Sequence, residues 1–121
     1  APERIANSMI VEVMRAKIHR IEVTAANLHY AGSIGLDEAL IEASGLVENE
    51  RVQVLDIENG ERFETYVIRS ERGSGEVSLN GPSARRVQIG DTVLVVAYGY
   101  LPVEEAQQHE PTVIYPQNNR V

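Results

Sequence analysis

Residues 51–70 read RVQVLDIENGERFETYVIRS, and this stretch decides the class of fold. Apolar and polar residues alternate over 51–57, which is the period of a half-buried strand. Asn59-Gly60 follows and is a strong short-range signal for a β-hairpin. Residues 61–70 supply the returning strand, with the side chains at 62, 64 and 66 on one face and those at 63, 65 and 67 on the other. The stretch therefore predicts an antiparallel hairpin.

The rest of the chain adds more strands and only short helices. Strand patterns cover 17–24, 76–79, 92–98 and 112–115, and the apolar run at 92–98 predicts a buried central strand. A short helix is expected over 37–44 with Gly45 as its C-terminal cap, and helical turns are expected near 84–86 and 101–106. Strands that outnumber short, interpolated helices predict a mainly β fold, a small barrel with helical insertions.

Length and composition fit one small domain. A chain of 121 residues supports a single modest core. We expect residues 1–8 to be an N-terminal extension, residues 9–116 to form the domain, and residues 117–121 to be a loose polar tail.

Charge and cysteine content exclude several classes of function. The net charge is −7 and the eleven Lys and Arg residues are scattered, which argues against nucleic acid as a partner. No apolar run approaches the roughly 20 residues of a membrane-spanning helix. The absence of cysteine agrees with a cytoplasmic location. His19, His29 and His109 lack metal-ligand spacing, so no metal is expected.

The peptide bond between Gly32 and Ser33 is a candidate for self-cleavage. Glycine leaves its carbonyl open to attack by the hydroxyl that follows, which would convert the amide to an ester. Elimination from that ester would leave a ketone at a new N-terminus. Gly-Ser is also a common turn dipeptide, and Gly73-Ser74 repeats it within a loop. The dipeptide alone favours a turn.

Two further stretches carry groups that could line a site. Lys17 and His19 are two residues apart on a strand and so share one side, although a solvated strand face has the same pattern. Residues 80–83, Asn-Gly-Pro-Ser, leave backbone amides free near a turn, and such amides can hold a carboxylate. A plain loop is the alternative.

Taken together, these motifs form an ordered set: Lys17-x-His19, Tyr30-x-Gly32-Ser33, Arg62-x-x-Thr65-Tyr66, Glu71-Arg72-Gly73-Ser74 and Asn80-Gly81. The set resembles the pyruvoyl-dependent aspartate 1-decarboxylases from about residue 9 to residue 115. The resemblance implies a six-stranded double-psi β-barrel and a homotetramer with active sites between subunits. It also implies decarboxylation of L-aspartate to β-alanine and carbon dioxide, for the synthesis of pantothenate and coenzyme A.

The resemblance also implies a role for each matching residue. Ser33 becomes a covalently bound pyruvoyl group that forms a Schiff base with substrate, so neither a metal nor pyridoxal phosphate is needed. Cleavage after Gly32 gives a β chain, 9–32, and an α chain, 33–121. Tyr66 is the proton donor, and Thr65 acts in processing and substrate contact. The remaining matches bind or surround the substrate: Lys17, His19, Tyr30, Arg62, Asn80, Gly81, Pro82 and Ser83.

Three positions depart from the family pattern. Ala31 stands where some members carry glutamate, Pro82-Ser83 replaces small alanine-type residues, and Arg85 lies near a position that varies in the family. We expect these to affect processing rate or affinity more than the type of reaction. Two other interpretations remain open: a barrel that binds a ligand without chemistry, and a pyruvoyl decarboxylase of another amino acid.

Overall fold

Eight strands and two short α-helices make up residues 9–121, the part of the chain that the computed structural model describes. The expected extension, residues 1–8, lies outside the described residues. None of the helices in the described part is long and apolar enough to span a membrane. In chain order the elements are β1 (Ile10–Glu22), β2 (Ala25–Asn27), β3 (Ser33–Asp37), α2 (Glu38–Ser44), β4 (Arg51–Asp56), β5 (Arg62–Ser70), β6 (Val77–Asn80), the 3-10 helix η1 (Gly81–Arg85), β7 (Thr92–Pro102), α3 (Val103–Gln108) and β8 (Thr112–Ile114).

The mainly β class with short helices is confirmed, but residues 9–121 hold eight strands where six were expected. Two of the eight give no alternating signal in the sequence. The three residues of β2 are too few to show a period. All five positions of β3 are buried, so its two faces do not differ in polarity.

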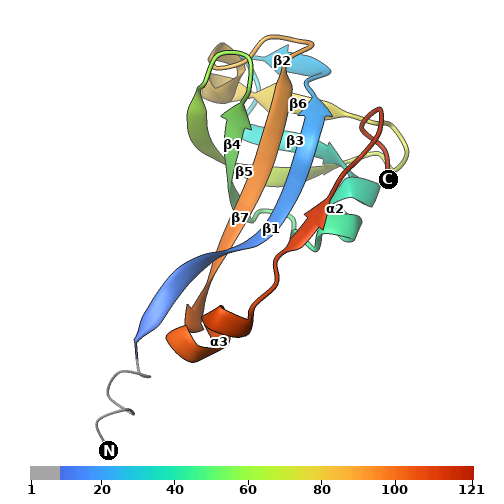
Figure 1. Cartoon of the computed structure of the whole chain (residues 1–121). Helices are drawn as coiled ribbons and strands as arrows, with labels where there is room; N and C mark the ends of the chain where they lie inside the picture. Colours follow the sequence, from blue (N-terminus) through green and yellow to red (C-terminus); the bar gives the residue numbers. More distant parts are fainter. Residues whose placement is uncertain (1–8) are drawn as a thin grey trace, which may run out of the picture.

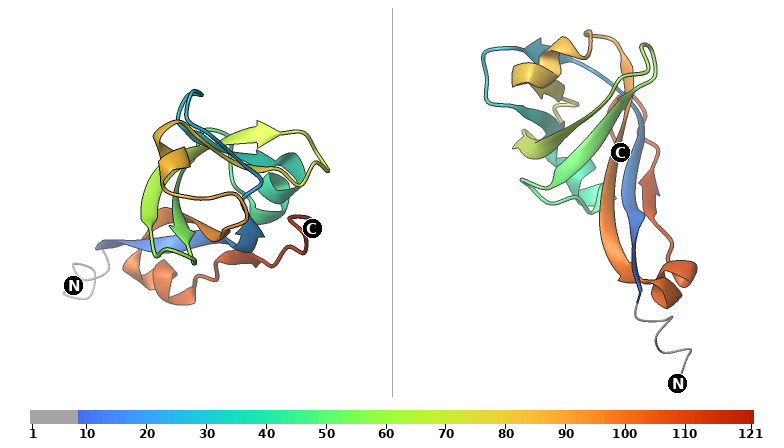
Figure 2. Two further views of the ribbon diagram at one scale, coloured as in Figure 1. Left: turned by 90° about the horizontal axis from the view of Figure 1, so that it is seen from above. Right: turned by 90° about the vertical axis from the view of Figure 1, so that its left-hand side faces the viewer.

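The strands are hydrogen-bonded in the order β2-β6-β3-β5-β4-β7-β1-β8. β3 lies between two partners, parallel to β5 and antiparallel to β6. β1 and β7 form the longest antiparallel pair, and Figure 1 shows this pair extending beyond the other strands to α3. Figure 2 shows that the strands curve around a common interior. β7 is central in the sheet, as its apolar run predicts.

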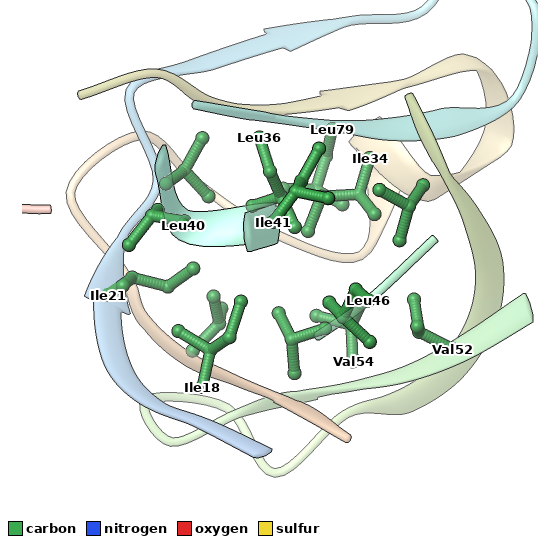
Figure 3. Close-up of a cluster of buried hydrophobic side chains, with 14 of the residues drawn as sticks. Ile18, Ile21, Ile34, Leu36, Leu40, Ile41, Leu46, Val52, Val54 and Leu79 are labelled. Carbon is green, nitrogen blue, oxygen red and sulfur yellow. The ribbon is translucent and has the colours of Figure 1, made fainter. Parts of the chain in front are cut away.

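The core fills this interior with aliphatic side chains from both ends of the sheet. Ile18 of β1, Ile34 and Leu36 of β3, Val54 of β4 and Leu79 of β6 are all fully buried. Figure 3 shows Leu40 and Ile41 of α2 joining the same cluster. Burial of so much aliphatic surface is the main stabilising term for a chain with few aromatic residues.

The predicted hairpin is formed by β4 and β5, but its loop is longer than a two-residue turn. Residues 57–61 connect the strands, because side chains close the loop locally. Asp56 Oδ1 accepts the N–H of Glu58, and Asn59 Oδ1 accepts the N–H of Glu61. The alternation along β5 is confirmed: Phe63, Thr65 and Val67 are less exposed than the residues between them.

The helix expected over 37–44 is α2, and Asp37 is its N-cap. Asp37 Oδ1 accepts N–H groups from Ala39 and Gly73, and Oδ2 accepts the N–H of Gly75. Burial by itself favours the neutral acid, but these N–H donors and Arg120 outweigh it and lower the pKa of Asp37. One carboxylate therefore ties α2 to the loop that precedes β6.

The tail expected to be loose is docked instead. Asn119 is buried, and its side chain accepts the N–H of Glu22 at 2.7 Å. It donates to the carbonyl oxygens of Glu22 and Gly75 at 2.8 and 3.0 Å. The polar sequence of the tail does not predict this contact, because the Asn119 side chain binds backbone groups that are remote along the chain.

Candidate active site

Ser33 lies at the start of β3, opposite Asn80 of β6. The side chain of Ser33 is 2% exposed, and its Oγ accepts a hydrogen bond from Asn80 Nδ2 at 3.0 Å. Its hydroxyl donates to the Ala31 carbonyl at 3.3 Å. The hydroxyl is therefore held in one orientation inside the protein rather than exposed on a turn.

Gly81 packs directly against the backbone that precedes Ser33. A Cβ at Gly81 would lie 2.8 Å from Gly32 Cα, 2.9 Å from Gly32 N and 3.0 Å from the Tyr30 carbonyl oxygen. Gly81 also has φ +67°, a conformation that glycine adopts readily. Only a residue without a side chain fits here, so the Asn80-Gly81 pair fixes both the serine hydroxyl and the peptide before it.

Thr65 and Tyr66 lie on β5, the parallel neighbour of β3. Ile34 pairs with Val67. Ser33 and Gly32 directly precede Ile34, as Tyr66 and Thr65 directly precede Val67, so the two dipeptides lie at the same end of this parallel pair. Thr65 is buried, whereas Tyr66 is 40% exposed and lines a cavity of about 220 Å³ with Arg51 and Glu64.

The second Gly-Ser pair has a different environment. The backbone N–H of Gly73 donates to Asp37 Oδ1, and Ser74 Oγ accepts the N–H of Glu76. Both residues are exposed. In the described part of the chain, Ser74 is not in a strand, and no side-chain amide binds its hydroxyl as Asn80 binds that of Ser33.

Arg62 begins β5, on the same face as Tyr66. Its Nη1 donates to Gln53 Oε1 at 2.9 Å, and the hydroxyl of Tyr98 donates to the same oxygen at 2.7 Å. Neither Gln53 nor Tyr98 was predicted from the sequence as a site residue. No sequence signal points to them, because both contacts join neighbouring strands diagonally.

No hydrogen bond joins Lys17 or His19 to Ser33 within residues 9–121. They flank the buried Ile18 on β1, four strand positions from β3, roughly 19 Å along the sheet. The His19 ring lies edge-on to Tyr115 with 5.3 Å between ring centroids. Burial, and then the charges of Lys17 and Arg20, lower the pKa of His19, so the neutral imidazole is favoured.

Lys17 does share a face of the sheet with Arg62. Lys17 pairs with Val96, and Val96 pairs with Gln53 on the next strand. Residues in register across a sheet point to the same side, so Lys17 and Gln53 are about 10 Å apart on one surface.

Comparison with known proteins gives the same family as the resemblance. The model of the aspartate decarboxylase family matches residues 9–121. A protein named aspartate 1-decarboxylase from Cytophaga hutchinsonii is 56% identical over 114 residues, which cover 93% of this chain and 99% of the relative. One of that name from Caldicellulosiruptor saccharolyticus is 56% identical over 111 residues, covering 92% of this chain and 87% of the relative.

The chain belongs to the aspartate decarboxylase family. A more distant relative, the aspartate 1-decarboxylase of Phocaeicola vulgatus, is 49% identical over 108 residues, which cover 89% of this chain and 93% of the relative. The resemblance drawn from the motifs is thereby confirmed.

Of the three departures from the aspartate decarboxylase pattern, Ala31 and Pro82-Ser83 lie beside the Gly32-Ser33 peptide, and Arg85 ends η1. Pro82 Cδ lies 3.6 Å from where a Gly32 Cβ would be, so Pro82 covers that peptide. Ser83 is buried within η1, and Pro82, Ser83 and Phe63 line a cavity of about 130 Å³. Residues 80–83 are thus the end of β6 and the start of a 3-10 helix rather than a plain loop. Ala31 contributes its carbonyl oxygen to the Ser33 hydroxyl.

Proposed function

We propose that this protein is an aspartate 1-decarboxylase that converts L-aspartate to β-alanine and carbon dioxide, for pantothenate and coenzyme A synthesis. Family membership supports the activity. The observation that carries the mechanism is the buried Ser33 hydroxyl, held by Asn80 beside a peptide on which Gly81 packs.

We propose that Ser33 is converted to a pyruvoyl group, the cofactor of the reaction. In the precursor, Ser33 Oγ would bond to the Gly32 carbonyl carbon, the peptide C–N bond would break, and the freed nitrogen would take the hydroxyl proton. Elimination would release Gly32 as a carboxylate. Water would then replace the nitrogen of residue 33, and that nitrogen would leave as ammonia. The pyruvoyl carbonyl supplies the electron sink that loss of an α-carboxylate requires.

The residues around Ser33 fit this conversion. The Asn80 amide donates to the oxygen that must attack, and it keeps that oxygen in place. The register of β3 and β5 supports a role for Thr65 at the Gly32 carbonyl, where its hydroxyl would donate to the developing oxyanion. We predict that the reaction requires neither a metal nor pyridoxal phosphate.

We propose roles for the residues on the face beside Ser33 in binding and protonating the substrate. Tyr66 would return a proton to the α-carbon, because its phenol hydroxyl is a proton donor. Arg62 would bind a substrate carboxylate through its fork of N–H donors. Gly81 to Ser83 would border the substrate, with Tyr30 nearby. Lys17 would add local positive charge, which an acidic protein needs to attract a dianion, and the neutral His19 imidazole would line the same region.

We further propose a homotetramer whose active sites lie between subunits. The four strand positions between β1 and β3 in the sheet order are compatible with this arrangement, in which a neighbouring subunit would supply Lys17 and His19. Size-exclusion chromatography with light scattering measures the assembly. A cytoplasmic location, and the absence of nucleic-acid and membrane partners, stay predictions from composition.

Intact mass under denaturing conditions tests the cofactor. We expect fragments of residues 1–32 and 33–121, the second carrying an N-terminal ketone that phenylhydrazine traps. Ser33→Ala should abolish both cleavage and carbon dioxide release, whereas Ser74→Ala should leave both unchanged. A fully active protein that remains uncut would contradict the proposal, and an uncut, inactive protein would favour a binding barrel. Assays with L-glutamate and other amino acids test the substrate.

A further inference from the structure

The side chain of Gln53 joins Arg62 on β5 to Tyr98 on β7. Gln53 Oε1 lies 2.9 Å from Arg62 Nη1 and 2.7 Å from the Tyr98 hydroxyl. A guanidinium only donates hydrogen bonds, so the atom it contacts must be the amide oxygen and not the amide nitrogen. The Tyr98 hydroxyl then donates to the same oxygen. Two donors thus fix the orientation of the Gln53 amide, and the amide fixes one side of the guanidinium.

The acidic residues that flank Arg62 are bound to other arginines. Glu61 pairs with Arg86 at 2.5 Å, and Glu64 pairs with Arg51. Within residues 9–121, Arg62 has no carboxylate within ion-pair distance, and its partner is the neutral Gln53 amide. The positive charge of Arg62 is therefore held in place without being neutralised.

The strand register explains why these three side chains meet. Gln53 lies opposite Glu64 on β5 and opposite Val96 on β7. Arg62 and Tyr98 are each two residues from those partners, which makes them diagonal neighbours of Gln53 on the same face. Gln53 and Tyr98 also line a cavity of about 430 Å³. Tyr66 is four residues from Arg62 on that face, about 13 Å along the strand.

We propose that Gln53 is a positioning residue for substrate recognition: its amide oxygen, itself held by the Tyr98 hydroxyl, orients Arg62 for a substrate carboxylate and leaves the guanidinium charge available. The proposal deepens the proposed function and rests on the assignment of Arg62 as a carboxylate ligand. It assigns the specificity for an anionic substrate partly to a neutral side chain. A carboxylate at position 53 would accept the same two hydrogen bonds but would compete with the substrate.

Gln53→Glu is therefore the decisive variant. It keeps an oxygen that accepts both hydrogen bonds and adds an ion pair with Arg62, which offsets repulsion from Glu64 on the facing strand, so the fold should be retained. We expect KM for L-aspartate to rise tenfold or more with kcat within about twofold. Gln53→Ala should raise KM about three- to tenfold, and Tyr98→Phe should raise it less. Gln107→Glu on α3 is the matched control, because it changes the net charge equally at an exposed position.

Binding of succinate gives a readout that does not depend on turnover. Succinate has two carboxylates and no amine, so calorimetry with the purified protein reports recognition of the anion alone. We expect its Kd to rise in the same order as KM, with Gln107→Glu like the wild type. Unchanged KM and Kd in Gln53→Glu, or a loss confined to kcat, would overturn the proposal. Wild-type protein that binds succinate but neither cleaves nor decarboxylates would instead refute the proposed function and leave this inference standing.

Discussion

Replacement of Gly81 by alanine tests whether close packing at the scissile peptide drives processing. The added Cβ would lie 2.8 Å from Gly32 Cα and 2.9 Å from Gly32 N, both closer than van der Waals contact permits. The contacted atoms are backbone and cannot rotate away, so Gly32 must move by several tenths of an ångström. We expect self-cleavage of Gly81→Ala to slow at least tenfold, because the attacked carbonyl leaves its alignment with the Ser33 hydroxyl.

The effect on stability has two parts that a control separates. Alanine in the left-handed conformation, φ +67° at Gly81, costs about 1 to 2 kcal/mol. The steric overlap adds about 1 to 3 kcal/mol, as overpacking commonly does. Gly45 has φ +78°, and a Cβ added there would meet no atom within 4 Å, so Gly45→Ala should show only the first cost and normal cleavage.

Cleavage is followed by mass spectrometry over time after purification of the precursor. Stability is compared by urea unfolding in a Ser33→Ala background, in which every variant has the same covalent structure. Equal rates of cleavage in Gly81→Ala and Gly45→Ala would refute the idea that this packing positions the peptide.

Two further predictions concern stability. Burial, together with the nearby Asp91 carboxylate, raises the pKa of Asp56 to about 6. The folded form then binds this proton more tightly than the unfolded chain, so the contribution of Asp56 to stability is lost as pH rises from about 4 through 6. Asp56→Asn should raise the free energy of unfolding by about 1 to 3 kcal/mol at pH 8 and by less at pH 5. Thermal and urea unfolding at both pH values will measure this. An equal gain at both pH values would contradict the prediction. Asn119→Ala removes three hydrogen bonds to Glu22 and Gly75 and should cost about 2 to 4 kcal/mol in urea unfolding, whereas a neutral effect would show that the docked tail does not stabilise the fold.

Local patterns in the sequence predicted those elements whose two faces differ in polarity. β5 alternates as expected because one face packs on the core and the other meets solvent. α2 was predicted from its acidic first turn and from Gly45, which takes φ 78°. β3 was missed because every one of its five positions is buried, so no alternation marks it. A strand of this kind is recognised only through its neighbours.

Contacts between segments remote in the chain could not be predicted from patterns. The docking of Asn119 on Glu22 and the loop before β6 leaves no trace in a polar tail. The Gln53 contacts depend on the register of three strands, which no single segment specifies. The candidate site was predicted instead from an ordered set of motifs, whose members lie on strands as far apart in the sheet order as β1 and β3.

The two Gly-Ser pairs lie in environments that differ in burial and hydrogen bonding. At Gly73-Ser74 the N–H of the glycine binds Asp37, and the serine hydroxyl accepts a local N–H in an exposed loop. At Ser33, strand pairing on β3 buries the hydroxyl, and Asn80 holds its oxygen. Attack on the preceding carbonyl needs a fixed, dehydrated hydroxyl beside a constrained peptide, and only the second environment provides both. The fold therefore distinguishes the two Gly-Ser bonds, and the proposed cleavage depends on this environment more than on the dipeptide itself.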